Sequence, residues 1–521
     1  MRLHDSLDYQ ARERPDAEFA VQGTRRITYR DAQAHANQLA CALVKARLAP
    51  GDRIAFLGKN SIEHLLMFFG ASKAGVVPVP LNYRLAPPEL RYIVNDAQAK
   101  LLIAAGDFAA NADAIGSEVT TVERRIALDA TPRPTNWQDY RSWLAAEPAT
   151  PLDRQVAAED DAYQMYTSGT TGRPKGAVLT HRAVTANVIQ QTMGLPALAP
   201  EERCLIVAPM YHATAAVTAF MSVFLGGCVH IQEDFNPFEV VRALSEDHIN
   251  RTVLVPAMIQ ACLVMVPDVG ERRYDALQLI GYGGSPIAEP TLRRALEVFH
   301  CDFTQGYGMT ELTSVLTFLS AADHRRALQE QPGLLLSAGR PLAGSEIRIV
   351  DAQDHPVPAG TVGEIIGRGP QMMRGYWNLP EASAEALRGG WMHTGDAGFV
   401  DDDGYLYLQD RVKDMIVSGG ENIYPREVEE VLFRHPAVAD AAVIGVPDER
   451  FGEAVKALVV LRDGATATAE EIMEFCKGKL AGYKRPRSVE FRRLLPRNPS
   501  GKTLKRELRE PYWQGHQRRV Y

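Results

Sequence analysis

The sequence predicts an α/β fold with a large N-terminal domain of parallel-type sheets and a small β-barrel, followed by a small α+β C-terminal domain. Three observations lead to this prediction. Up to about residue 340, short apolar runs alternate with helical stretches, which is typical of βαβ units. From there to about residue 410, short strands and turns replace the helices, and a compact α+β pattern follows. The 521 residues also exceed what a single hydrophobic core usually organises.

The first 160 residues contain the start of the alternation. Residues 1–50 are predicted to be helical and polar, and Ser61 is expected to cap a helix with an apolar stripe at Ile62, Leu65, Leu66 and Phe69. A further helix is expected at 88–95. Apolar runs predict strands at 54–57, 76–79 and 101–104. Residues 107–160 are rich in Ala, Pro and charge with little periodicity, so we interpret them as variable surface.

The alternation continues beyond residue 177. Strands are predicted at 205–208, 229–232, 252–255, 277–280 and 302–304, with helices at 240–248, 256–266 and 289–299. The small β-barrel, at about 340–410, is expected to contain strands at 346–350, 363–367, 398–400 and 405–408. The C-terminal domain, residues 414–521, is expected to contain helices at 426–433 and 469–480 and strands at 441–444, 456–461 and 489–492.

Composition narrows the class of protein. A net charge of −7 gives no indication of a nucleic-acid partner. The six cysteines are dispersed without a Cys-x-x-Cys pair, so neither a zinc site nor a disulfide framework is predicted. The N-terminus has no apolar signal core, and no apolar run is long enough to cross a membrane. We therefore expect a cytoplasmic enzyme without a transmembrane span.

The most informative stretch is Tyr166-Thr167-Ser168-Gly169-Thr170-Thr171-Gly172-Arg173-Pro174-Lys175-Gly176. Its glycines permit close backbone approach, its hydroxyls and N–H groups can face an anion, and Lys175 adds positive charge. Polyphosphate is the natural ligand, although the spacing is not that of a P-loop. A Ser/Thr/Gly-rich turn alone would more often be only a polar hairpin loop.

This stretch closely resembles the phosphate loop of the acyl-adenylate-forming family, which includes acyl-CoA synthetases, peptide-synthetase adenylation domains and luciferases. The resemblance implies that ATP and a carboxylic acid form acyl-AMP and pyrophosphate, and that a thiol such as coenzyme A then takes the acyl group. It also implies a magnesium ion, and a C-terminal domain that rotates about a hinge at 411–413. Homodimers occur in this family, but no sequence feature identifies an interface.

Further family motifs follow in the family's order: 209–212, 281–286, 305–311, 391–396, Arg411, 418–425 and 496–502. By resemblance, Lys502, Thr310, Glu311 and His212 are catalytic, and Glu311 with Thr170 holds the metal. Lys502 would bridge the carboxylate and the α-phosphate, and His212 would close the acyl tunnel. The residues expected to contact ATP or AMP are Thr167, Ser168, Gly169, Thr170, Thr171, Lys175, Gly283, Gly284, Ser285, Gln305, Gly306, Tyr307, Gly308, Thr310, Asp396, Arg411 and Lys502.

The same resemblance assigns the remaining sites. Asp396 and Arg411 would bind the ribose, and Tyr307 would stack on adenine. Lys413 would be the hinge residue, and coenzyme A would pass the loop that contains Ser418, Gly419, Gly420 and Asn422. The residues expected to line the acyl pocket are Tyr211, His212, Ala213, Val217, Met258, Tyr282, Gly283, Gly306, Met309 and Val315.

The expected acyl pocket limits the class of acid, and the fate of the activated acyl group separates three hypotheses about function. Because this lining is mostly apolar, a hydrophobic acid is predicted, either a medium- or long-chain fatty acid or an aryl or phenylpropanoid acid. Residues 209–224 contain no carboxylate to pair with a substrate ammonium, which disfavours an amino acid. A coenzyme A ligase is therefore favoured. A free-standing enzyme that loads a carrier protein is the alternative, and a luciferase-like oxygenase is the least favoured.

Overall fold

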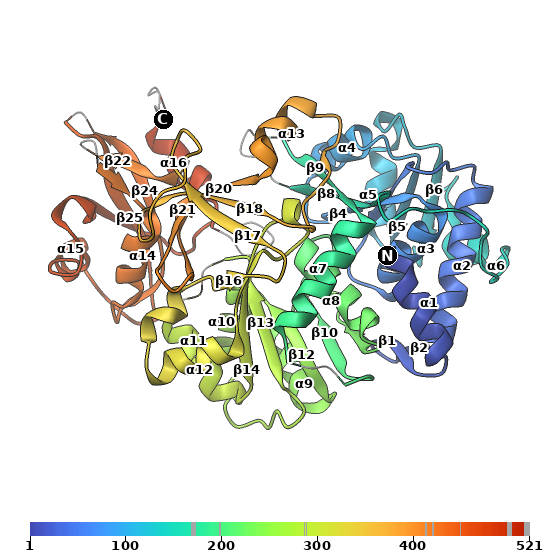
Figure 1. Ribbon diagram of the computed structural model, residues 1–521, viewed down its shortest axis with the longest axis horizontal. Helices are drawn as coiled ribbons and strands as arrows, with labels where there is room; N and C mark the ends of the chain where they lie inside the picture. The colour runs from blue at the N-terminus through green and yellow to red at the C-terminus, as the bar shows by residue number, and fades with distance from the viewer. Residues whose placement is uncertain are drawn as a thin grey trace.

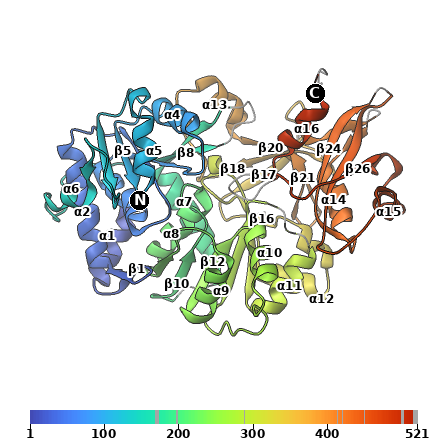
Figure 2. The ribbon, with the colours of Figure 1, turned by 180° about the vertical axis from the view of Figure 1, so that it is seen from behind.

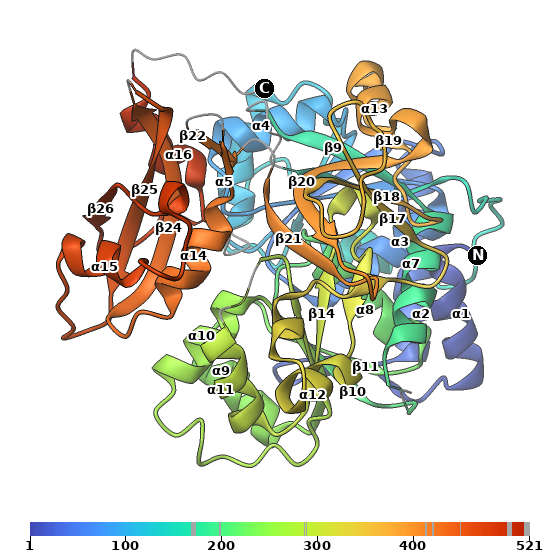
Figure 3. The same cartoon turned by 60° about the vertical axis from the view of Figure 1, so that its left-hand side comes forward.

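The computed structural model describes residues 1–167, 173–196, 199–285, 287, 289–411, 414–418, 421–448, 450–497 and 503–514, without the side chains of Ser117, Asp410, Arg411, Glu421 and Asn422. The C-terminal elements gather at one end of the molecule, away from the first helices of the chain (Figure 1). Figure 3 shows the same C-terminal group standing beside the larger N-terminal part. The predicted α/β class is confirmed.

A five-stranded parallel sheet with the order β4-β3-β5-β6-β7 forms the first layer. Its elements are β3 (Arg53–Leu57), α3 (Ile62–Ala74), β4 (Val77–Leu81), α4 (Pro87–Asp96), β5 (Leu101–Ala105), α5 (Phe108–Ala114), β6 (Arg124–Leu128), β7 (Gln138–Asp139) and α6 (Tyr140–Ala145). Ser61 caps α3 as predicted, because its side chain accepts from the His64 N–H at 3.0 Å. The prediction that 107–160 is variable surface is wrong in part, since β6 and β7 extend this sheet.

A nine-stranded sheet with the order β16-β15-β14-β13-β12-β10-β11-β1-β2 forms the second layer. Its strands are β1 (Glu18–Gln22), β2 (Arg25–Thr28), β10 (Arg203–Ile206), β11 (Cys228–Ile231), β12 (Ile249–Leu254), β13 (Leu279–Gly283), β14 (Asp302–Tyr307), β15 (Thr317–Leu319) and β16 (Arg340–Pro341). The predicted all-helical segment 1–50 is wrong, because β1 and β2 interrupt it. They complete the sheet edge, where β1 pairs in parallel with β11.

Helices cover both faces of this sheet. The helices α7 (His181–Gly194) and α8 (Ala213–Phe224) lie on the face seen in Figure 1. The helices α9 (Pro237–Glu246), α10 (Pro256–Met265) and α11 (Glu289–Phe299) lie on the opposite face, seen in Figure 2. The remaining helices of this domain are α1 (Leu3–Glu13), α2 (Tyr29–Lys45) and α12 (Ala321–Gln329). Two separate apolar cores therefore flank the sheet.

Three further sheets complete the described chain. Strands β8 (Asp161–Thr167), β9 (Lys175–Thr180) and β19 (Gly375–Tyr376) form an antiparallel sheet followed by α13 (Pro380–Ala386). The predicted small β-barrel corresponds to a four-stranded antiparallel sheet of β17 (Glu346–Val350), β18 (Gly363–Arg368), β20 (Met392–Val400) and β21 (Leu406–Arg411). The C-terminal part contains β22 (Ile416–Ser418), β23 (Glu421–Ile423), α14 (Pro425–Phe433), β24 (Val438–Asp448), β25 (Gly452–Leu461), α15 (Ala469–Phe475), β26 (Ser488–Phe491) and α16 (Lys505–Arg509).

The buried histidine His64 makes the stability of the large N-terminal domain depend on pH. Its ring is fully buried and lies between Phe56 and Phe68, with ring centroids 4.3 and 5.7 Å away. Burial lowers the pKa of His64 from 6.5 to about 3. The unfolded chain therefore binds a proton below pH 6.5 that the folded chain excludes, so stability falls as the pH drops from 6.5 toward 3.

We expect His64→Phe to remove this part of the pH dependence. The gain in free energy of unfolding over wild type should be larger at pH 5 than at pH 7.5, by about 2 kcal/mol. Urea unfolding at both pH values measures it. His355→Phe is the matched control, since the His355 side chain is 77% exposed. An equal effect of His64→Phe at the two pH values would contradict the prediction.

Candidate active site

The strands that flank the predicted phosphate loop are held from two sides. Residues 168–172, which include the predicted ligands Ser168, Gly169, Thr170 and Thr171, lie outside the described residues. On the described flanks, Thr167 pairs with Lys175 across β8 and β9. The Tyr166 hydroxyl donates to Asp96 Oδ2 at 2.6 Å, and the indole of Trp377 donates to the Asp96 carbonyl at 2.9 Å. The Trp377 backbone N–H also donates to the Gly176 carbonyl at 2.8 Å, so the described residues on both flanks of the loop are anchored.

The Glu311 carboxylate lies directly against this flank. It is 5% exposed, and its Oε1 accepts from Thr167 Oγ1 at 3.3 Å and from the Tyr376 hydroxyl at 2.9 Å. The pKa of Tyr376 is raised by burial and by the adjacent Glu311 charge, so the tyrosine stays a neutral donor. The Lys175 ammonium lies 4.9 Å from the centre of the Tyr376 ring. The structure thus brings together Thr167, Lys175 and Glu311, which the sequence assigned to one phosphate and metal site.

An unusual turn follows Glu311. Thr313 has φ 65° and ψ −55°, and the Ser314 N–H donates to the Leu312 carbonyl at 2.7 Å, which is a γ-turn of the strained, positive-φ type. Positive φ is costly for a β-branched residue. The Thr313 hydroxyl offsets part of that cost by donating to the Gln371 carbonyl at 2.7 Å. This turn fixes the backbone on which Glu311 stands.

Glycines bring the ends of β13 and β14 close to neighbouring backbone. Gly283 pairs with Gly306, and a Cβ on Gly283 would overlap the Gly306 carbonyl. A Cβ on Gly308 would likewise overlap the carbonyl of Ser314, inside the turn that supports Glu311. Only glycine fits at these two positions without a backbone shift.

We expect Gly308→Ala to destabilise the protein by about 3 kcal/mol, because the added methyl meets backbone rather than a flexible side chain. It should also reduce activity at a temperature where the protein is fully folded, since Ser314 belongs to the turn that directly follows Glu311. Thermal unfolding and initial rates at 15 °C would measure the two effects. The control is Gly333→Ala, where a Cβ would meet no atom within 4 Å. If Gly308→Ala has wild-type stability, the backbone at Ser314 moves away from the added methyl at little cost, which would contradict the prediction.

The residues predicted to bind the ribose are neighbours in the structure. Asp396 on β20 and Arg411 on β21 are cross-strand partners, although the Arg411 side chain lies outside the described set. The hydroxyl of Tyr307, whose ring is predicted to stack on adenine, donates to Asp396 Oδ2 at 2.9 Å. The Gln305 side chain is buried and accepts from the Tyr282 hydroxyl at 3.4 Å. Tyr307 and Asp396 therefore form one connected unit.

The residues predicted to line the acyl pocket divide between the two faces of the nine-stranded sheet. Ala213, Val217 and Met309 pack in the first core, on the α7 and α8 side, whereas Met258 and Tyr282 pack in the second. The Tyr282 hydroxyl bonds to His324 Nε2 at 2.9 Å. The ring of Tyr282 is thus part of the core, and near the site this residue offers only its backbone.

His212 lies at the N-terminus of α8 and differs from these packed residues. Its Nε2 is inaccessible to water and has no hydrogen-bond partner among the described atoms, and burial together with the Arg84 charge lowers its pKa to about 4. The ring of Tyr211 lies 4.5 Å away, and the Tyr211 hydroxyl accepts from Arg84 at 3.3 Å. A buried polar atom without a partner is costly, so a bound ligand could satisfy it.

Several predicted residues are not described. Lys413, Gly419, Gly420 and Lys502 lie outside the described residues, as does the side chain of Asn422. Ser418 is described at the end of β22 and is buried. Gly284 and Ser285 follow β13 and Thr310 follows β14, as the sequence predicted, and Val315 lies shortly before β15.

Sequence reasoning missed Tyr376 and Trp377. Tyr376 ends the short strand β19 and Trp377 follows it. No apolar pattern marks this strand, and the role of both residues depends on its pairing with β9, about 200 residues earlier. The Arg53 guanidinium stacks 3.4 Å from the centre of the Trp377 ring, which adds a contact from the first sheet. Two adjacent aromatic residues before Pro380 were the only available signal.

This two-part α/β fold and the meeting of its motifs around Glu311 define an enzyme that binds a nucleotide and forms an acyl adenylate. The pattern of the AMP-binding enzyme family matches residues 7–377, and that of the AMP-binding enzyme C-terminal domain matches residues 427–502. The chain belongs to this family and is an AMP-forming acid–thiol ligase. Among the described residues, no helix is long and apolar enough to cross a membrane.

Relatives align along nearly the whole chain. A feruloyl-CoA synthase of Amycolatopsis sp is 39% identical over 503 residues, which cover 96% of this chain and 97% of that one. A fatty acid–[acyl-carrier-protein] ligase, ScoC of Streptomyces coeruleorubidus, is 37% identical and covers 99% and 98%. The solved structure of the anthranilate CoA ligase AuaEII with anthranoyl-AMP is 27% identical, has a TM-score of 0.90 and covers 98% and 97%.

Proposed function

We propose that the chain activates a hydrophobic carboxylic acid, fatty or aromatic, as acyl-AMP and then transfers the acyl group to coenzyme A. The observation that carries this proposal is the buried Glu311 carboxylate held against the flank of the phosphate loop. The absence of acidic residues from 209–224 supports an acid without an amino group. The relatives named for ferulic acid and for a fatty acid support the same range of substrates.

The residues around Glu311 suit a magnesium ion. A carboxylate and hydroxyl oxygens are the donors that Mg²⁺ prefers, and it usually uses few protein ligands besides phosphate and water. Glu311 would hold the ion with Thr170, and the ion would neutralise charge on the phosphates. We assign Lys175 and Lys502 to the phosphate and carboxylate oxygens, where negative charge develops during adenylation. Asp396 and Arg411 would bind the ribose.

His212 and Tyr211 would face the acid. The buried Nε2 of His212 needs a partner, and its lowered pKa keeps the ring neutral at physiological pH. A neutral imidazole can close an apolar tunnel without introducing charge. Ala213 beside it leaves space for a long or bulky acyl group. We propose that Gly419, Gly420 and Asn422 approach coenzyme A after the C-terminal domain rotates about Lys413.

A carrier-protein thiol is the alternative acceptor, and the similarity to ScoC favours it specifically. The two acceptors are distinguished by measuring AMP release from ATP and Mg²⁺ with acids from acetate to palmitate, benzoates, cinnamates and amino acids. Each acid is tested alone, with coenzyme A, and with a phosphopantetheinylated acyl carrier protein. Turnover that requires coenzyme A and an apolar acid supports the proposal. If only the carrier protein discharges the acyl-AMP, the acceptor is a carrier-protein thiol and not coenzyme A. Activity only with amino acids would overturn the proposal that the substrate is a hydrophobic acid.

A further inference from the structure

The strand that presents Asp396 contains an irregularity in its pairing. On β18 and β20, Glu364 pairs with Ala397 and Ile366 pairs with His393. The single residue Ile365 therefore lies opposite the three residues 394–396. Such a bulge changes the direction in which a strand presents its side chains. Asp396 owes its orientation to this bulge.

Three contacts hold the bulge in shape. The Thr394 hydroxyl donates to the Ile365 carbonyl at 2.6 Å and accepts from the Asp396 N–H at 3.1 Å. Gly395 has φ +68°, which a glycine adopts without strain. Its N–H donates to Glu364 Oε1 at 3.1 Å. Of these three contacts, only the one to Glu364 involves a side chain from outside residues 394–396.

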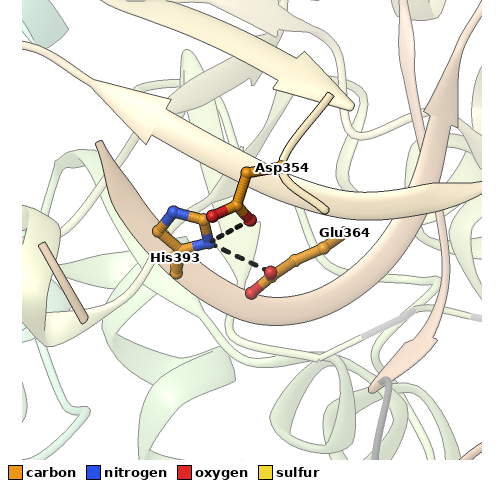
Figure 4. Close-up of side chains that lie close together, drawn as sticks. All are labelled: Asp354, Glu364 and His393. Carbon is orange, nitrogen blue, oxygen red and sulfur yellow. Dashed lines mark hydrogen bonds and ion pairs between the residues drawn. The ribbon is translucent and has the colours of Figure 1, made fainter. Parts of the chain in front are cut away.

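Glu364 is itself fixed from the other side. Its Oε2 accepts from His393 Nδ1 at 3.0 Å (Figure 4). The same oxygen accepts from Arg388 at 3.3 Å. The Arg388 guanidinium also binds both oxygens of Asp354, at 2.8 and 2.9 Å. Asp354, Glu364 and His393 are close enough to hold a metal ion. Because Arg388 already pairs with both carboxylates, the cluster is better explained as a support for the bulge.

We propose that Glu364 is a positioning residue for ribose recognition: its bond to the Gly395 N–H sets the bulge, and the bulge sets Asp396 toward the ribose hydroxyls. The inference rests on the proposed role of Asp396. The Tyr307 hydroxyl restrains Asp396 Oδ2 from one side at 2.9 Å, and Glu364 restrains the backbone from the other. Without Glu364, the N–H of Gly395 loses its partner, and the backbone of the bulge can move away from the conformation that orients Asp396.

The test compares AMP with 2′,3′-dideoxy-AMP by calorimetric binding, and ATP with 2′,3′-dideoxy-ATP by kcat/KM, in wild type and in Glu364→Ala. We expect the preference for the ribose hydroxyls to fall by roughly tenfold, the size of one charge-assisted hydrogen bond. The KM for the acid should stay unchanged. A merely structural role would weaken both nucleotides equally and leave the preference intact, which would overturn the proposal.

Three variants make the result decisive. Asp354→Ala removes a carboxylate of the same cluster that does not contact Gly395, so it should keep the wild-type preference; an equal loss would overturn the proposal. Glu364→Gln retains an oxygen acceptor and should keep most of the preference even if Glu364→Ala folds poorly. Asp396→Ala should lose it. A wild-type preference in Asp396→Ala would instead refute the ribose assignment, independently of Glu364.

Discussion

Glu311→Gln is expected to reduce adenylation by roughly 10²- to 10³-fold and to raise the Mg²⁺ concentration needed for half-maximal rate. Glutamine keeps an oxygen that can accept from Thr167 and Tyr376, so the fold should survive. What it loses is the negative charge that would hold the metal beside the phosphates. Acid-dependent exchange of pyrophosphate into ATP, measured across a Mg²⁺ titration, gives both quantities.

Tyr376→Phe serves as the matched control for this prediction. It removes one of the hydrogen bonds to Glu311 and leaves the charge, so we expect at most a tenfold loss in rate. Its Mg²⁺ dependence should change less than that of Glu311→Gln. If Glu311→Gln exchanges pyrophosphate with wild-type Mg²⁺ dependence, Glu311 is not the metal carboxylate.

Lys502→Ala is expected to abolish pyrophosphate exchange, a loss of roughly 10³-fold or more, because it removes the positive charge proposed to bridge the carboxylate and the α-phosphate as charge builds between them. Thiolysis of supplied acyl-AMP should persist, because the carboxylate–phosphate bond is already formed in acyl-AMP and the thiol only has to displace AMP from it. Measuring the two half-reactions separately tests both statements.

The neighbouring Lys505 provides the control for Lys502. Its ammonium forms an ion pair with Glu429 at 3.0 Å, a contact within the C-terminal domain. Lys505→Ala should therefore leave exchange within a few-fold of wild type, since this pair, whose side chains are 14% and 13% exposed, supports the fold of the C-terminal domain. Retained exchange in Lys502→Ala, or an equal loss in Lys505→Ala, would remove Lys502 from its assigned role.

The sequence predicted the parts of the fold whose signal is local. The Ser61 cap, the helix at 289–299 and the strands of the parallel sheets follow from capping chemistry and apolar runs, and the structure contains them. The strands β1 and β2 were missed because they are short, and because β2 lies at the sheet edge with exposed arginines. Helices α7 and α8 were missed because burial on several sides removes the amphipathic periodicity.

The residues of the candidate site divide in the same way, into those with a local sequence signal and those without one. Glu311, Tyr307 and Asp396 each belong to a sequence motif, and the structure brings each into contact with another part of the site. Tyr376 and Glu364 belong to no motif that sequence reasoning used, because their roles come from strand pairing and from a bulge. Positions defined by long-range pairing leave no local pattern, so they become visible only when the fold is known.

The small sheet of β8, β9 and β19 has a consequence for how the enzyme acquires its activity. It joins Val178 to Gly375 and Ala177 to Tyr376, residues nearly 200 positions apart along the chain. Closing so long a loop costs entropy that local contacts do not recover, and high contact order slows folding. We therefore expect the nucleotide site to be completed late in folding. Recovery of ATP binding after denaturation would report the end of folding, while recovery of helical structure would report its beginning.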